Sequence, residues 1–355
     1  MAQTALHEVK SSRFDKATMV RGGPAFVMVS WMTHIPRSTD LAQALDAQAV
    51  YMPWARPGRS VARTSLGWLR SGLRTWRVVR HLPAGSVVLA TAPPVFCPLV
   101  ALLAARRSGV HVAVDLHSGG LNDARWRWSV NIMRWAIRHA EAVIVTNPDL
   151  LEGQDTGVTP VLVIQDPVWT GAWPLVDPRP MPGRPYAIFP ASGSTDEPIG
   201  ALAEAAALLE GQVEIVVTGD RPVLSQRPGL RLTGFLPAAE FQDLMAHATV
   251  VLALTTREAT MQRAAYEGLQ LGRPLVCSDT KVLRRVLGNA AVFVENSGPG
   301  IATGIMDATS RADELHAAGT AVQATIKAEA ERGLAAVRAL AVANRHADPD
   351  GVTRG

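Results

Sequence analysis

The segment 248–279 decides the fold, and it reads ATVVLALTTREATMQRAAYEGLQLGRPLVCSD. Residues 250–254 form a short uninterrupted apolar run, which is typical of a strand buried inside a parallel sheet. Residues 260–271 carry apolar side chains at helical spacing, and Gly272 and Pro274 end that pattern. Residues 275–278 predict a second buried strand. The segment is therefore a strand–helix–strand unit, the building block of a doubly wound sheet.

This unit predicts a phosphate-binding helix start. We expect backbone N–H groups at Thr260, Met261 and Gln262 to lie at the positive end of the helix dipole, where anions bind. Glu267 follows Met261 at a distance of roughly 9 Å along a helix, which is about the reach from a diphosphate to the ribose of the same nucleotide. A carboxylate there can accept hydrogen bonds from two ribose hydroxyls. The alternative is a solvated helix glutamate that binds nothing.

The sequence from Glu267 to Pro274, EGLQLGRP, resembles the donor-binding signature of the retaining GT-B glycosyltransferases of family 4. In that family a Gly and a Pro follow the Glu at the spacing of Gly272 and Pro274 here. The resemblance implies that Glu267 holds the ribose of a nucleotide-sugar donor. The family has a second Glu, which touches the donor sugar, and this chain has Ala259 at that position. Glu258 is one place away, so we assign the contact with the donor sugar to no residue of this sequence.

The turn at residues 190–198, PASGSTDEP, differs from the family in its charge. Family members usually place Arg and Lys in this turn to bind the donor diphosphate, whereas this turn contains no cation. We expect backbone N–H groups at Gly193 and Ser194 to contribute instead. Arg263, in the first turn of the predicted helix, is our candidate for the compensating positive charge, with Arg221 and Arg257 as alternatives.

The first half of the chain predicts its own set of buried strands, at residues 25–30, 49–52, 87–90, 111–116, 142–146 and 161–164. His117 comes directly after the strand 111–116. The resemblance implies a catalytic role for it, because family members often carry a His at this position that contacts and positions the donor sugar. His34 follows the first strand and is our acceptor-side candidate, since ligands of doubly wound sheets bind at the carboxyl ends of the strands. For both residues the alternative is a loop histidine without a role.

Charge and tryptophan are unevenly distributed. Residues 1–140 contain 18 Lys and Arg against 6 Asp and Glu, a net charge of +12, whereas residues 141–355 carry −8. All nine Trp lie between Trp31 and Trp173. Residues 59–81 predict an amphipathic helix with Leu and Trp on one face and Arg on another. Such a helix either lies on an anionic membrane or packs on the sheet with its basic face in solvent.

Residues 86–105 contain no charged side chain, but Pro93, Pro94 and Pro98 interrupt them. We therefore expect a strand and a buried helix there rather than a membrane span. Cys97 and Cys277 lie in apolar runs and predict two buried thiols in a reducing compartment. The expected location is cytoplasmic, with peripheral contact at the inner face of the membrane.

The order of elements predicts an α/β protein of two Rossmann-like doubly wound parallel-sheet domains, the GT-B fold, facing each other across a cleft. We expect an acceptor-side domain at 1–178, a donor domain at 179–345 and a tail at 346–355, with a Pro-rich linker over 169–185. In the donor domain, Gly219 belongs to a turn that resembles a glycine turn of the family. The Ala-rich helix at 310–345 is expected to cross back over the first domain.

These features predict a glycosyltransferase that moves a sugar from a nucleotide-diphosphate sugar to a glycan or lipid-linked acceptor in cell-envelope or polysaccharide synthesis. The resemblance implies retention of anomeric configuration. No Asp-x-Asp lies at an expected cleft position, and we expect no metal, no cofactor beyond the nucleotide sugar and no nucleic-acid partner. A nucleotide-sugar epimerase and an inactive binding or scaffold protein remain alternatives. A nicotinamide oxidoreductase is excluded because no Gly-x-Gly-x-x-Gly follows the first strand.

Overall fold

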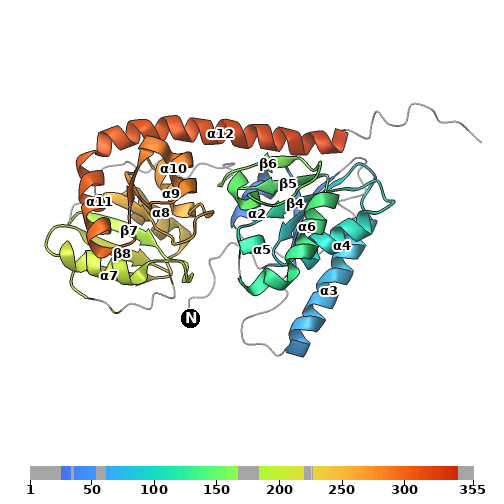
Figure 1. Cartoon of the computed structure of the whole chain (residues 1–355), viewed down its shortest axis with the longest axis horizontal. Helices are drawn as coiled ribbons and strands as arrows, with labels where there is room; N and C mark the ends of the chain where they lie inside the picture. Colours follow the sequence, from blue (N-terminus) through green and yellow to red (C-terminus); the bar gives the residue numbers. More distant parts are fainter. Residues whose placement is uncertain are drawn as a thin grey trace, which may run out of the picture. The chain divides into compact units, whose positions relative to one another are not determined.

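The computed structural model describes residues 25–32, 36–52, 61–122, 124–166, 184–219, 225 and 227–342. These residues form two units, each built around one parallel sheet (Figure 1). The amino-terminal unit comprises residues 7–170 and 328–355, and the carboxyl-terminal unit comprises residues 1–6 and 171–327. His34, the predicted boundary at 178/179, most of the predicted linker and the predicted tail lie outside the described residues.

The amino-terminal unit has a six-stranded parallel sheet in the order β2–β1–β3–β4–β5–β6. Its strands are β1 (Phe26–Ser30), β2 (Gln48–Tyr51), β3 (Val87–Ala92), β4 (His111–Leu116), β5 (Ala142–Val145) and β6 (Val161–Val163). Its helices are α2 (Pro36–Ala44), α3 (Val61–Arg80), α4 (Phe96–Ala105), α5 (Gly119–Asn122) and α6 (Val130–His139), with 3-10 turns η1 (Ala124–Ser129) and η2 (Pro148–Leu151). All six predicted strands are confirmed.

The carboxyl-terminal unit has a second six-stranded parallel sheet, in the order β12–β11–β10–β7–β8–β9. Its strands are β7 (Tyr186–Pro190), β8 (Glu214–Thr218), β9 (Leu230–Gly234), β10 (Val250–Ala253), β11 (Leu275–Ser278) and β12 (Ala291–Val294). Its helices are α7 (Ile199–Leu208), α8 (Ala238–Ala246), α9 (Arg263–Gln270), α10 (Lys281–Leu287) and α11 (Gly298–Ser310), with 3-10 turn η3 (Gly288–Ala290). The last helix, α12 (Ala312–Val342), begins in this unit.

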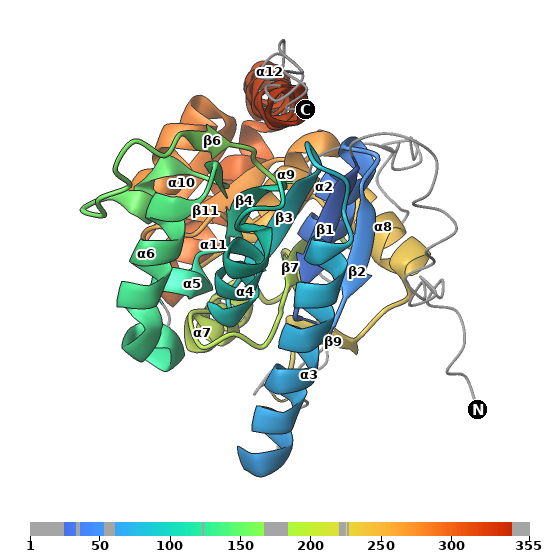
Figure 2. The ribbon, with the colours of Figure 1, turned by 90° about the vertical axis from the view of Figure 1, so that its right-hand side faces the viewer.

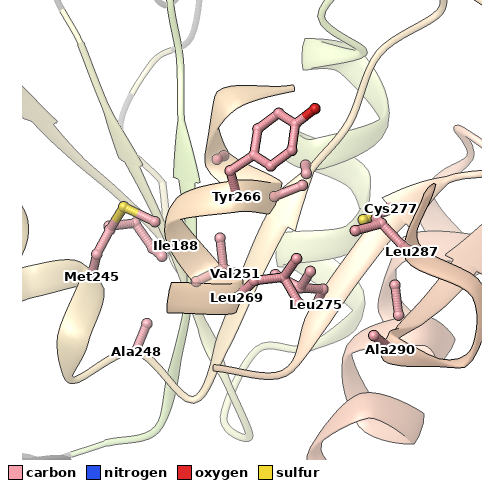
Figure 3. Packing of buried hydrophobic residues seen from close by; sticks show 14 of the residues in the cluster. Ile188, Met245, Ala248, Val251, Tyr266, Leu269, Leu275, Cys277, Leu287 and Ala290 are labelled. Atoms are coloured by element: carbon pink, nitrogen blue, oxygen red, sulfur yellow. The ribbon is translucent and has the colours of Figure 1, made fainter. Parts of the chain in front are cut away.

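The inner strands of both sheets are largely apolar, which is typical of parallel strands that are covered on both faces. All four residues of β10 and of β11 are buried. Figure 3 shows Leu269 of α9 packed beside Val251 and Leu275 of these two strands. A Cβ on Gly268 would lie 2.4 Å from Leu275 Cδ2, so only glycine lets α9 pack this closely on the sheet. The close packing fixes the place of the neighbouring Glu267.

The last helix, α12, contributes residues to the cores of both units. Residues from Ala328 onward belong to the amino-terminal unit, where Ala330, Leu334, Val337 and Ala341 pack in one cluster with residues of α2, β3 and β5. A Cβ on Gly333 would lie 2.5 Å from Ile164 Cγ1, which again requires glycine at a close approach. The expected return of the last helix to the first unit is confirmed.

The uncharged stretch 86–105 forms β3 and α4, as expected. Among the described residues, no helix has both the length and the apolar character needed to cross a bilayer. Cys97 and Cys277 are free and fully buried, and burial raises the pKa of both thiols. Both are therefore unreactive core residues.

Candidate active site

The carboxyl-terminal sheet has a topological switch point between β7 and β10. The chain runs from β7 to β8 and β9 on one side and continues from β10 to β11 and β12 on the other. Doubly wound sheets bind ligands at such a switch point, among the loops that leave the carboxyl ends of the two strands. These loops are the turn 190–198 and the segment 254–262, the two stretches from which the sequence predicts a donor site.

Asp196 joins these two loops. The hydroxyl of Thr255 donates to Asp196 Oδ2 at 2.6 Å, the backbone N–H of Thr256 donates to the Asp196 carbonyl at 2.8 Å, and Arg257 Nη2 lies 3.5 Å from Asp196 Oδ1. Burial raises the pKa of Asp196, but hydrogen bonds from Ser194 and Thr255 and the charge of Arg257 lower it overall. Asp196 thus holds the two loops together, and Arg257 is its ion-pair partner.

The backbone N–H groups of the turn already hold an anion. The Glu197 carboxylate accepts from the backbone N–H and the hydroxyl of Ser192, both at 2.6 Å, and from the N–H of Gly193 at 3.2 Å. Gly193 has φ +74°, which glycine adopts without strain. The N–H groups of Ser192 and Gly193 therefore form an anion-binding loop with a side-chain carboxylate bound in it. Ser194, from which we expected an N–H donor, contacts Asp196 through its hydroxyl.

Helix α9 begins later than the sequence predicts. The expected helix was 260–271, whereas the structure has Arg263–Gln270, with Gln262 in an extended conformation at φ −85° and ψ 129°. Thr260, Met261 and Gln262 therefore precede the helix and are not its first turn. Met261 misled the prediction because it is apolar for another reason: it packs against the core from a loop. The N–H groups at the helix start are those of Arg263 and the residues after it.

Glu267 and Arg263 form an ion pair on α9. Glu267 is only 6% exposed, and Arg263 Nε donates to its Oε1 at 2.8 Å. Glu267 is therefore not a solvated glutamate. Its carboxylate lies in the middle of α9, and the cation one turn earlier places a positive charge beside it.

Gly219 and Glu258 have structural roles. Gly219 has φ +103°, and a Cβ on it would lie 2.2 Å from the Ala191 carbonyl oxygen, so glycine allows β8 to end against the turn after β7. Glu258 Oε2 accepts from the backbone N–H of Lys281 at 3.1 Å, at the start of α10. Glu258 thus binds a backbone N–H at the start of α10. It therefore does not replace the acid that the family has at the position of Ala259. Arg221 lies outside the described residues.

In the amino-terminal unit, His117 belongs to a buried charged cluster. His117 Nε2 lies 3.0 Å from Asp115 Oδ2. Arg37 Nε and Nη2 donate to Asp115 Oδ1, both at 3.2 Å. Arg37 Nη1 donates to Asp166 Oδ1 at 3.1 Å and to the Ile164 carbonyl at 2.9 Å. The cluster lies where β4 and β6 end and α2 begins.

Asp115 stays ionised in this cluster. Burial raises its pKa, but the charge of Arg37 and hydrogen bonds from His117 and Arg37 lower it to about 2. The two carboxylates in turn raise the pKa of Arg37 against the effect of burial. Sequence reasoning missed Arg37 and Asp115, although there was a signal. Asp115 is the only polar residue in the stretch 112–116, and a buried charge requires a partner.

Residues 186–311 match the family model of the glycosyl transferases group 1. The carboxyl-terminal unit contains a group 1 glycosyltransferase domain. The group 1 domain spans the turn 190–198, the segment 254–262 and helix α9, which are the segments from which the sequence predicts a donor site. No match was found among curated protein sequences.

Solved structures with the GT-B fold resemble the whole chain. They include HepE from Anabaena in complex with UDP-glucose, with 13% identity and a TM-score of 0.64 over 91% of this chain and 100% of that one. Sucrose-phosphate synthase from Thermosynechococcus elongatus has 12% identity and a TM-score of 0.68 over 92% and 100%. An α,α-trehalose-phosphate synthase (UDP-forming) from Burkholderia vietnamiensis has 11% identity and a TM-score of 0.68 over 94% and 100%. The chain thus has the two Rossmann-like domains of the GT-B fold.

Proposed function

We propose that this chain transfers a glycosyl group from a UDP-sugar to a glycan or lipid-linked acceptor, with retention of configuration and without a metal ion. The observation that carries the proposal is the buried Glu267 carboxylate of the group 1 domain, paired with Arg263 on the helix that follows the switch-point strand β10. HepE, a structural neighbour, was solved with UDP-glucose, which makes UDP the first nucleotide to test. The test is release of UDP from UDP-sugars in the presence of EDTA, with candidate acceptors.

Departure of the diphosphate needs positive charge and N–H donors at the leaving oxygens. In this chain the donors are Arg263, the N–H groups at the start of α9 and the turn 190–198. The turn can contribute only after the Glu197 carboxylate leaves its N–H groups, since two anions cannot share them. Glu197 therefore competes with the donor diphosphate in this proposal.

This competition gives a prediction about Glu197. Glu197→Gln keeps the length of the side chain and removes its charge, so we expect nucleoside diphosphates to bind severalfold more tightly, with no comparable gain for the nucleoside alone. Isothermal titration calorimetry with UDP and uridine measures both. Glu210→Gln, at an exposed position after α7, is the matched control. Weaker UDP binding by Glu197→Gln would show that the carboxylate only supports the turn.

His117 is the proposed catalytic residue of the amino-terminal unit, in contact with a hydroxyl of the reacting sugar. We expect His117→Ala to lower kcat severalfold to about tenfold, because one hydrogen bond between neutral groups contributes ~0.5–1.5 kcal/mol. The affinity for UDP should not change, since the nucleotide contacts lie on the group 1 domain. Steady-state kinetics and calorimetry separate these effects, with the exposed His81→Ala as control. Unchanged turnover would remove His117 from the site.

Helix α3 supports the proposed peripheral membrane contact. Four of its large apolar side chains are exposed: Leu66 is 47%, Leu69 60%, Leu73 49% and Trp76 45% exposed. In Figures 1 and 2 the amino-terminal part of α3 extends beyond the rest of its own unit. Between α3 and α4 an apolar groove of about 310 Å³ is lined by Trp31, Trp68, Trp76 and Phe96, among others. These features match an interfacial helix.

The charge around α3 selects an anionic bilayer as its partner. The chain has no Asp or Glu between Asp46 and Asp115, while α3 alone carries Arg70, Arg77 and Arg80 with exposed side chains. Juxtaposed basic and apolar side chains bind anionic lipid surfaces. We therefore propose contact with the inner face of the cytoplasmic membrane, which would also bring the enzyme to a lipid-linked acceptor.

Vesicle co-sedimentation tests this contact. Full-length protein should bind vesicles that contain phosphatidylglycerol and should not bind pure phosphatidylcholine vesicles. The double variant Leu69→Ser/Trp76→Ser should lose binding, because it removes two apolar side chains from the contact. Leu208→Ser, at a 53% exposed position of the other unit, is the control. Equal binding by the double variant would contradict the proposal.

A further inference from the structure

His117 and Arg37 share a single buried carboxylate, but each takes a different oxygen. Arg37 binds Asp115 Oδ1 through Nε and Nη2, and His117 Nε2 faces Oδ2. An ionised carboxylate only accepts hydrogen bonds, so His117 Nε2 must be the donor. In the neutral imidazole, the other ring nitrogen, Nδ1, is then the acceptor.

We propose that Asp115, held in place by Arg37, is the positioning residue that fixes the tautomer and the orientation of His117. The imidazole then presents Nδ1 as a hydrogen-bond acceptor for a sugar hydroxyl. The reaction it serves rests on the proposed glycosyl transfer, whereas the tautomer is a property of the protein alone.

Arg37 suits this role because it leaves Oδ2 to the histidine. Arg37 is 2% exposed. Its planar guanidinium donates hydrogen bonds to Asp115, Asp166 and the Ile164 carbonyl at the same time. These partners lie at the ends of β4 and β6, so Arg37 ties the His117 loop to a second part of the sheet edge. Without a fixed carboxylate, the imidazole would be free to rotate and to exchange tautomers.

The second carboxylate of the cluster, Asp166, provides a control for the role of Asp115. Asp115 and Asp166 both bind Arg37, and of these two carboxylates Asp115 is the one that lies beside His117 Nε2, at 3.0 Å. Asp115→Asn offers the imidazole either an amide oxygen or an amide N–H, so it no longer dictates the tautomer. Asp166→Asn removes an equal charge from Arg37 and leaves the carboxylate beside His117 in place.

The experiment is ¹⁵N NMR of the histidine-labelled full chain, at a pH at which the imidazole is neutral. His117→Gln identifies the His117 signals among the nine histidines. The wild-type spectrum should show the Nε2–H tautomer, and Asp166→Asn should keep it. Asp115→Asn should give a mixture or the Nδ1–H tautomer. An Nδ1–H tautomer in the wild type would overturn the proposal without any variant, even if Asp115→Asn fails to fold. An unchanged tautomer in a folded Asp115→Asn would also overturn it.

Kinetics then separate this proposal from the proposed function. We expect Asp115→Asn to lower kcat about tenfold, as expected for one lost charge-assisted hydrogen bond, with the affinity for UDP unchanged. Asp166→Asn should have a much smaller effect on kcat. Equal losses in the two variants would reduce Asp115 to a structural role. A confirmed tautomer in a protein without transferase activity would refute the proposed function and leave the positioning of His117 intact.

Discussion

Replacing Arg37 by methionine should lower the free energy of unfolding of the amino-terminal unit by about 3–5 kcal/mol, the usual effect of removing one member of a buried ion pair. Methionine fills a similar volume, but it leaves the fully buried Asp115 carboxylate without its main counter-charge. Asp166 and the Ile164 carbonyl lose a donor in the same step. The effect is large because the charges left behind are buried and no water can replace the guanidinium.

Urea unfolding followed by tryptophan fluorescence measures this loss in the correct unit, because eight of the nine Trp lie within residues 31–169. Arg311→Met is the control: Arg311 also binds two carboxylates, Asp307 and Glu314, but at an exposed position where solvent screens the charges. It should leave the tryptophan transition unchanged. Equal transitions for Arg37→Met and the wild type would mean that the buried cluster does not stabilise the unit.

The same variant should change the response to acid. The pKa of Asp115 is about 2 in the folded protein, against an ordinary value of 3.8, so its contribution to stability is complete above about pH 4 and is lost as the pH falls towards 2. In Arg37→Met the pKa of Asp115 is no longer depressed by the guanidinium. The stability of the amino-terminal unit should therefore depend less on pH within this window.

Glu267→Ala should weaken the binding of UDP about tenfold or more, since losing charge-strengthened hydrogen bonds costs ~1.5–3 kcal/mol. If Glu267 holds the ribose, the same factor should apply to uridine, UMP and UDP. Calorimetry with the three ligands measures it. Glu240→Ala, at an exposed position in the first turn of α8, is the matched control. Unchanged affinity would remove Glu267 from the site.

Arg263 separates the phosphate contact from the ribose contact. Arg263 is paired with Glu267, so Arg263→Ala also disturbs the proposed ribose contact of Glu267. The loss of affinity for uridine in Arg263→Ala measures that disturbance. Any additional loss for UDP measures the contact with the diphosphate. We expect that additional loss, because the turn 190–198 contains no cation and Arg257 is paired with Asp196. Equal losses for uridine and UDP would make Arg263 a partner of Glu267 only.

Much of the fold could be predicted from the sequence because buried parallel strands are apolar along their whole length. The runs at 250–254 and 275–278 became β10 and β11, and the spacing of Glu267, Gly272 and Pro274 placed α9 between them. The start of α9 could not be predicted, because Met261 is apolar both as a helix residue and as a loop residue packed on the core. Periodicity does not distinguish these cases.

The charged contacts were the part that the sequence could not predict. Arg37 meets Asp115 and Asp166 across a long stretch of chain, and no local pattern joins them. The Glu197 carboxylate binds N–H groups only a few residues away, but the turn geometry that brings them together depends on Gly193 at φ +74°. For α3 two interpretations were open from the sequence, and the exposure of Leu69 and Trp76 supports the proposed interfacial one.

A thermal-shift screen of the full chain tests whether the group 1 domain binds a nucleoside-diphosphate sugar, as we propose. The ligands are UDP, GDP, ADP, TDP and CMP, with UDP- and GDP-sugars alongside. Ligands that bind only the folded state raise Tm by mass action. We expect UDP and its sugars to raise Tm, and we expect Glu267→Ala to abolish this rise. No rise with any nucleotide would contradict nucleotide-sugar binding and favour a scaffold protein, in which Ala259 and the cation-free turn mark a lost donor site.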